Sequence, residues 1–188
     1  MNRSRRCRAV WALVIAGALA AGGSLSASQD ATAPELKAAF LLNFARFTIW
    51  PDNALPIGAP LMFCVSGDDR IADAIEELAR RQQIQDRAIL VHRVKADVAA
   101  VCHLLYSSAG QLGRDRPLLR TLAASPVLTV SDSPEFTKAG GIVNFYVDNG
   151  KMRFAMNPKA AERAQLKISS KLLNLARIVK DVSNAFDS

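Results

Sequence analysis

Four short apolar runs, with helical spacing in the segments between them, constrain the fold of this chain more than any other feature. They read LMFCVSG at 61–67, AILVHRV at 88–94, CHLLYSS at 102–108 and VLTVSD at 127–132. Short continuous apolar runs are typical of strands buried on both faces, and strands separated by helices form parallel sheets through right-handed crossovers. The pattern predicts a single α/β domain with a mostly parallel sheet in the Rossmann-like, doubly wound order, flanked by helices.

The predicted sheet ends in a hairpin, because two strand-like runs in GIVNFYVDNGKMRFAMN are joined by Asp148-Asn149-Gly150. An N-terminal helix from Glu35 should stop at Trp50, since Pro51 disfavours helical geometry in the residue before it. Further helices are expected at 68–83, 96–101, 117–124, from Ser133 onward, at 157–165, and from a cap at Ser169 or Ser170 to Val179. The last of these should place Leu172, Leu175, Ala176 and Val179 on one face.

The first 27 residues have the three parts of a secretory signal peptide. Four arginines in MNRSRRCRAV precede WALVIAGALAAGGSLSA, which carries no charge and ends in small residues. The strongly apolar part, 11–21, is much shorter than the roughly 20 residues that span a bilayer, which disfavours a permanent anchor. We therefore expect export, cleavage near Ala27 or Ser28, and a mature domain at 28–188.

The charge balance argues against nucleic acid as a partner. The chain has 24 basic and 17 acidic residues, and the leader holds four of the arginines and no acid. The mature chain then has 20 against 17, a net charge of +3, which is weak for nucleic-acid binding. No basic stripe interleaved with aromatic residues stands out in the sequence.

Recognised catalytic and cofactor motifs are missing from the sequence. It contains no GxGxxG after a strand, no GxxxxGK[ST], no HExxH and no GxSxG, so no enzymatic activity and no cofactor are predicted. Asp68, Asp69 and Asp132 follow predicted strands, where open parallel sheets bind ligands. They also stand where a helix start favours an acid, and we favour this capping role over general acid–base catalysis.

Cys64 and Cys102 are the two cysteines of the mature chain. In an exported protein such a pair predicts a disulfide, and the first and third strands that hold them are neighbours in the order 2-1-3. Free or redox-sensing thiols are the alternative. A zinc site that also uses His92 and His103 is disfavoured, because adjacent residues of a strand point to opposite faces.

The stretch KAAFLLNFARFTIWP at 37–51 is too short and too interrupted by polar residues to cross a membrane. We expect Phe40, Phe44 and Phe47 to pack under the sheet. Side chains left over after one face is buried would mark an interaction surface. The candidate partner-binding residues are Leu41, Ile49, Trp50, Leu173 and Ile178. Trp50→Ala should then weaken partner capture and leave folding intact.

Several segments together resemble the YfiR family of periplasmic regulators over essentially the whole mature chain. They are KAAFLLNFARFTIWP, FCVSG, CHLLYSS, LTVSDSPEFTKAGGIVNF and RFAMNPKAAERAQLKISSKLLNLARIV. The resemblance implies a periplasmic α/β protein that self-associates, as a homodimer, and has no enzymatic activity. It further implies binding to the periplasmic sensor domain of an inner-membrane diguanylate cyclase, whose repression lowers cyclic-di-GMP and biofilm formation.

The cysteines of this chain match only part of the family pattern. Cys64 and Cys102 match the pair that joins two strands in the family. Some members carry a second pair near the hairpin, and residues 143–152 of this chain hold no cysteine. Control that depends on a second disulfide is therefore not expected.

Two other classes of function remain open on the sequence. A periplasmic small-ligand binder, feeding a membrane receptor or sensor kinase, would use the crevice at the strand ends near Gly67, Ser107 and Ser131. A hydrolase without a recognised motif is the third possibility, and a structural or assembly role is the fourth.

Overall fold

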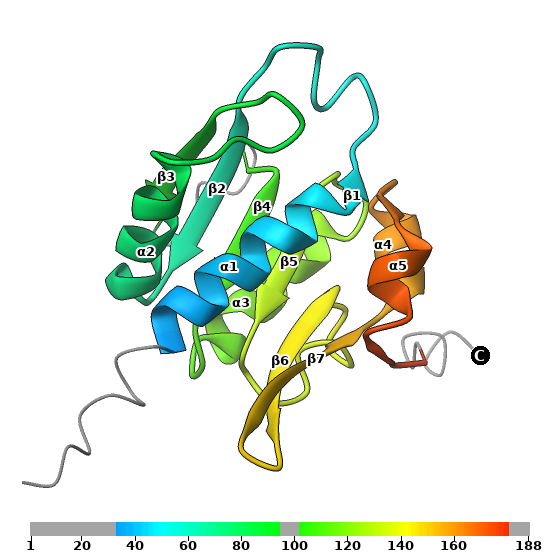
Figure 1. Cartoon of the computed structure of the whole chain (residues 1–188). Coiled ribbons are helices and arrows are strands. Elements are labelled where there is room, and N and C mark those ends of the chain that lie inside the picture. The colour runs from blue at the N-terminus through cyan, green and yellow to red at the C-terminus, as the bar shows by residue number, and fades with distance from the viewer. Residues whose placement is uncertain (1–32, 95–101, 181–188) are drawn as a thin grey trace, which may run out of the picture.

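A seven-stranded sheet organises the computed structural model, which describes residues 33–94 and 102–180. Helices α1 (Ala33–Arg46) and α2 (Asp69–Ala79) cover one face, and α3 (Leu112–Leu122) covers the other (Figure 1). The short helices α4 (Pro158–Arg163) and α5 (Ser170–Leu173) lie beyond one edge. The strands of the sheet are β2 (Leu61–Ser66), β3 (Ile89–Arg93), β4 (Leu104–Ser107), β5 (Leu128–Ser131), β6 (Val143–Asp148), β7 (Lys151–Met156) and β9 (Arg177–Ile178).

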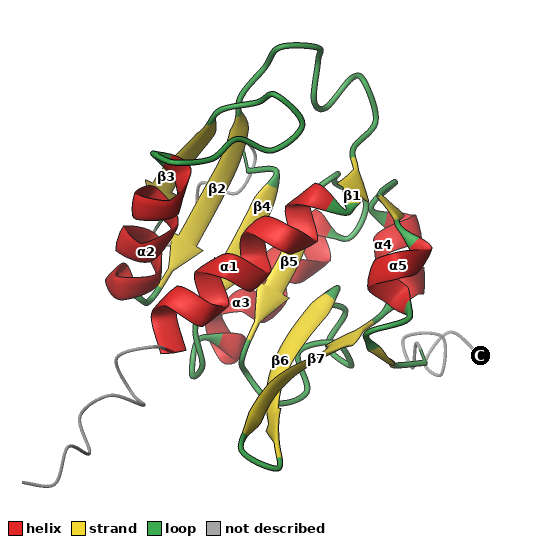
Figure 2. Ribbon diagram, viewed as in Figure 1, coloured by secondary structure: helices red, strands yellow, loops and turns green. Residues whose placement is uncertain are grey.

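The strand order β3-β2-β4-β5-β6-β7-β9 confirms the predicted doubly wound topology. The first five strands of this order, β3, β2, β4, β5 and β6, are mutually parallel (Figure 2). Strand β7 returns antiparallel to β6, and β9 is parallel to β7. The hairpin prediction is confirmed, because Asn149 and Gly150 connect β6 and β7 with φ of 49° and 70°. Both values fit a two-residue I′ turn, which matches the twist of paired strands.

Alternation along the strands divides the interior into a large and a small core. Phe63 and Val65 of β2 face the large core, which contains residues of α1 and α2. Cys64 faces the small core, which contains Leu122 at the end of α3, and Met62 packs against that core. Successive side chains of a strand point to opposite faces, so one apolar run supplies both layers.

Helix α1 packs its phenylalanines on the sheet, as the sequence predicts. Phe44 is fully buried, with ring centroids 4.9 Å from Phe154 and 5.6 Å from Phe145 of the hairpin. Phe40 joins the same cluster, and Phe47 packs against the large core half-buried. These contacts tie the first helix to the two strands of the hairpin.

The predicted end of the first helix is wrong by four residues. Helix α1 stops at Arg46, and Thr48–Ile49 form strand β1, which pairs antiparallel with β8 (Lys167–Ile168). The Thr48 hydroxyl donates to the carbonyl of Phe44 at 2.7 Å, which satisfies one of the helix's terminal acceptors. Tertiary pairing with β8 therefore extends the chain before Pro51 can end the helix.

Two other predicted helices are wrong. The segment from Ser133 forms turns instead, and Glu135 has a φ of 68°, which an α-helix cannot contain. The C-terminal helix is limited to α5, and the chain then becomes β9. Backbone pairing with β7, including the 2.8 Å bond from the Val179 amide to the Met156 carbonyl, outweighs the local helical pattern.

The remaining helix predictions are confirmed with shifted bounds. Helix α3 begins at Leu112 and contains Pro117, which the sequence placed at the helix start. Asn157 caps α4 by accepting from the Ala160 amide at 3.0 Å. The helix predicted at 96–101 lies outside the described residues. Among the helices that the structure describes, none has the length and apolar character needed to cross a bilayer.

Candidate functional site

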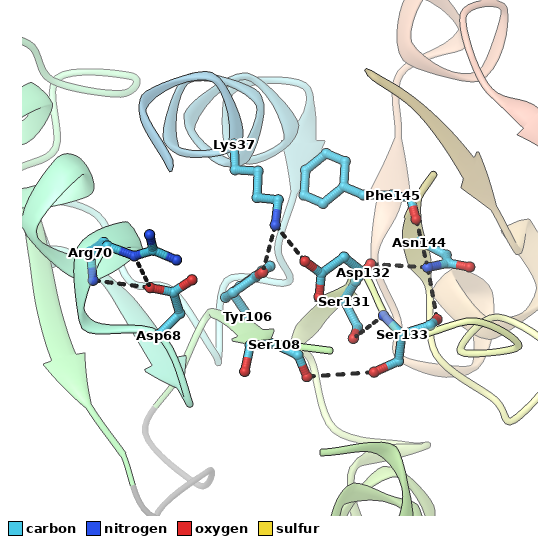
Figure 3. Close-up of polar contacts among 10 residues, drawn as sticks. All are labelled: Lys37, Asp68, Arg70, Tyr106, Ser108, Ser131, Asp132, Ser133, Asn144 and Phe145. Atoms are coloured by element: carbon cyan, nitrogen blue, oxygen red, sulfur yellow. Dashed lines mark hydrogen bonds and ion pairs between the residues drawn. The ribbon is translucent and has the colours of Figure 1, made fainter. Parts of the chain in front are cut away.

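Polar side chains gather at the carboxyl ends of the parallel strands, under the N-terminal part of α1 (Figure 3). Lys37 of α1 forms an ion pair with the Asp132 carboxylate, just after β5. Its Nζ also lies 3.5 Å from the hydroxyl of Tyr106 in β4 and donates to it. The Lys37 and Asp132 side chains are only 17% and 20% exposed, so water screens this pair weakly. We call Lys37, Tyr106 and Asp132 the strand-end cluster.

The electrostatics of the strand-end cluster favour a structural role. Burial raises the pKa of Tyr106 far above its ordinary value, and the negative charge of Asp132 raises that pKa further. The phenol therefore stays protonated at neutral pH and cannot act as a base. One carboxylate oxygen of Asp132, Oδ1, is buried and accepts no hydrogen bond from the part of the chain that the structure describes. Asp132 thus depends on Lys37 for most of its compensation.

Neighbouring polar groups are satisfied within the protein. The Ser133 amide donates to the Ser131 hydroxyl at 3.0 Å, and the Asn144 side-chain amide donates to the carbonyls of Ser131 and Ser133 at 3.1 and 3.0 Å (Figure 3). These bonds fix the loop after β5 against β6. A Cβ on Gly67 would lie 2.3 Å from the Ser108 hydroxyl, so the strand ends are closely packed at this point.

One groove of the described structure lies outside the strand-end cluster. It has a volume of about 430 Å³ and lies between the start of α1 and helix α2. Its lining is mainly acidic and apolar, with one arginine: Pro34, Glu35, Arg70, Asp73, Ala74, Glu77 and Leu78. The sequence-predicted crevice near Gly67, Ser107 and Ser131 is not part of that lining.

The three candidate acids have different roles. Asp68 caps α2 by accepting from the Arg70 amide at 3.1 Å, which confirms the capping interpretation. The Asp69 side chain is 85% exposed and lies 3.6 Å from Arg93. Asp132 caps no helix, because the segment after it forms turns, and it pairs with Lys37 instead. The sequence analysis did not single out Lys37, because its partner lies 95 positions away in the chain.

Replacing Lys37 by Met should lower the free energy of unfolding by about 1–3 kcal/mol, because it leaves a largely buried carboxylate without its cation. The methionine keeps most of the aliphatic volume. Urea unfolding followed by circular dichroism measures the change. The double variant Lys37→Met/Asp132→Asn should recover part of the loss. If the losses measured for Lys37→Met and for Asp132→Asn simply add in the double variant, the two side chains are not coupled and the expectation is contradicted.

The disulfide prediction is confirmed: Cys64 and Cys102 are bonded, with their Cα atoms 5.8 Å apart. The bond lies in the small core, and both cysteines are buried. His103 accepts from the Met62 amide at Nδ1, and its Nε2 lies 3.1 Å from the Ala54 carbonyl. Both ring nitrogens are therefore engaged, and the described residues contain no cluster of potential metal ligands.

The predicted partner-binding residues divide into exposed and buried ones. Leu41 is fully buried and Trp50 is 5% exposed, so neither contributes to an exposed patch. The Trp50 indole donates to the His103 carbonyl at 3.2 Å, and Trp50→Ala would therefore disturb folding, contrary to the sequence expectation. Ile49 and Ile178 are 60% and 51% exposed, and Leu173 is half-buried against the large core.

Sequence reasoning missed several exposed aliphatic residues, among them Leu175, which is 75% exposed. The predicted C-terminal helix placed it on the buried face, whereas the chain leaves α5 before this position. Arg177 and Ile178 form β9, the outermost strand on this side of the described sheet, and Leu175 lies just before it. We call Leu175, Arg177 and Ile178 the β9 edge.

The chain matches a known protein family. Residues 34–177 match the family described as YfiR/HmsC-like. The matched segment begins in α1, includes both cysteines, and ends in β9. It covers well over half of the 188-residue chain.

Proposed function

Because the chain belongs to the YfiR/HmsC-like family, we propose that it is a periplasmic regulator of an inner-membrane signalling protein. It binds the periplasmic sensor domain of that protein and represses it. The partner we propose is a diguanylate cyclase, so that binding lowers cyclic-di-GMP and biofilm formation. The observation that carries this proposal is the family match over 34–177, preceded by a leader that has the parts of a signal peptide.

Repression of this kind needs only a difference in affinity. A regulator that binds the inactive form of a sensor more tightly than the active form shifts the population toward the inactive form. It needs a binding surface and no catalytic group. This fits a strand-end cluster whose polar groups mainly stabilise the fold. We propose no cofactor.

The surface we assign to the partner is the β9 edge. Leu175 and Ile178 expose aliphatic surface there, and β9 is the outermost strand on this side of the sheet. Exposed apolar side chains beside an unpaired strand edge favour docking of another protein. Ile49 on β1 is a further exposed candidate, and Leu173 is a half-buried one that packs against the large core. We also propose that the regulator is a homodimer.

Deletion of the gene should raise cellular cyclic-di-GMP, because the cyclase loses its repressor. Complementation with the unmodified chain should restore the lower level, and Leu175→Asp should fail to do so. Ile57→Asp is the matched control, since Ile57 is 98% exposed in the loop before β2. The measurement is cyclic-di-GMP in cell extracts by mass spectrometry, with immunoblots of the periplasmic fraction to verify equal protein levels.

An unchanged cyclic-di-GMP level in the deletion strain would contradict the cyclase assignment. Full complementation by Leu175→Asp would instead remove the β9 edge from the interface and leave the cyclase assignment intact. Thermal unfolding of both variants should match that of the unmodified protein, because each substituted side chain is exposed.

A further inference from the structure

The hairpin carries an arginine-rich face around one tyrosine. Phe145, Met152, Phe154 and Met156 belong to the large core or pack against it, so the alternate residues of β6 and β7 point to the opposite face. Tyr146 is paired with Arg153, and Ala155 with Arg177 of β9. Lys151 lies on the same face of β7 as Arg153. We call Lys151, Arg153 and Arg177, with Tyr146 between them, the basic hairpin face.

Arg177 is held in place by the aromatic ring. Its guanidinium carbon lies 4.1 Å from the centroid of the Tyr146 ring. Stacking engages the flat face of a guanidinium and leaves its N–H groups available in the plane. Lys151, Arg153 and Arg177 are exposed, and none of the three forms an ion pair within the described part of the chain.

The positive charge of the chain is concentrated in the C-terminal segment that supplies most of this face. Residues 151–180 contain eight basic residues and one acid, Glu162, a net charge of +7. Residues 28–150 contain 12 basic and 14 acidic residues, a net of −2. The weak mature charge of +3 therefore conceals a strongly basic C-terminal segment. All eight basic residues of that segment are exposed.

We infer that the basic hairpin face recognises a carboxylate-rich surface on the protein partner, beside the aliphatic contacts of the β9 edge. This inference rests on the proposed function and specifies the chemistry of its partner. Charge complementarity is the argument: Arg177, positioned on the Tyr146 ring, can match a carboxylate in a bidentate fork. Asp148 lies opposite Lys151 on this face, whereas Arg153 and Arg177 form no ion pair among the described residues. A protein is favoured over a lipid surface because Arg177 lies on β9, which is the outermost strand on this side of the sheet within the described residues.

The test uses the purified periplasmic domains of the host's inner-membrane diguanylate cyclases, immobilised and probed with the mature chain by interferometry. Arg177→Glu and Arg153→Glu should each weaken binding at least about tenfold at low salt, because a like charge then faces the carboxylates. Arg177→Lys keeps the charge and should lose much less. Raising NaCl from about 0.05 to 0.5 M should weaken binding by the unmodified chain.

Arg81→Glu is the matched control, because it makes the same change of charge just after α2, which contacts β3 at the opposite edge of the sheet. Arg81 is 76% exposed, and its partner Glu77 keeps Arg80. Binding by Arg81→Glu should equal that of the unmodified chain.

The outcomes separate the inference from the proposed function. A domain that binds equally well after charge reversal at Arg153 and Arg177 overturns the inference alone. Failure of every domain to bind overturns both. Vesicles with and without phosphatidylglycerol form a parallel arm. Sedimentation with the anionic vesicles, lost in Arg177→Glu while domain binding persists, assigns the face to a membrane and overturns the inference.

Discussion

Replacing both Cys64 and Cys102 by Ala is expected to lower the free energy of unfolding by about 4 kcal/mol. The bond joins residues separated by 38 positions, and in the chain-entropy model closure of such a loop restricts the unfolded chain by roughly that amount. Besides the two cysteines, the buried residues of the small core are Leu105, Leu122 and Val127, so the disulfide is a large part of what stabilises this core. The loss should therefore not be compensated by repacking.

Urea unfolding of the mature chain, with and without dithiothreitol, measures this effect. The reductant should shift the midpoint of the unmodified chain to that of the double variant, and it should leave the double variant unchanged. The expectation is contradicted if mass spectrometry shows that the disulfide is reduced and the urea midpoint of the unmodified chain nevertheless stays unchanged.

Phe44→Ala should cost about 3–5 kcal/mol of the free energy of unfolding, as large-to-small substitutions of buried aromatic residues do. Phe44 is fully buried between α1 and the hairpin, where it touches the rings of both Phe145 and Phe154. The cavity would lie between α1 and the hairpin. These cannot easily approach each other, because the ion pair of Lys37 with Asp132 also fixes α1 against the sheet.

Phe47→Ala is the comparison variant, since Phe47 is half-buried in the same segment. Chemical denaturation of the two variants should show a clearly smaller loss for Phe47→Ala. Equal losses would mean that the contribution of α1 comes from its apolar surface in general and not from the phenylalanine cluster of the hairpin.

Local and covalent signals explain which parts of this fold were predictable. The apolar runs around Cys64 and Leu105 are continuous, so they predict buried strands, and Asn149-Gly150 determines its turn almost alone. Strand β9 escaped prediction because its pairing with Met156 and Ala155 is long-range, while its sequence retains helical spacing.

The candidate partner residues also depend on contacts that are distant in the sequence. Leu41 is expected to be left over from one buried face, but α1 is enclosed by the sheet and by α2, so more than one of its faces is buried. Trp50 lies beyond α1 and is buried where its indole donates to the His103 carbonyl. Ile178 is exposed as predicted, for a different reason: it stands on an edge strand and not on a helix. The pairing of Lys37 with Asp132 spans 95 positions, and no local pattern announces it.

The phenylalanine cluster also has a consequence for biogenesis. Phe44 contacts Phe145 and Phe154, which enter the chain more than a hundred residues later. In a polypeptide that emerges with its N-terminus first, the apolar surface of α1 therefore stays exposed until the hairpin has been synthesised or translocated. Interactions this distant slow folding and leave nascent chains prone to association, so a holding chaperone should be needed during most of synthesis or translocation.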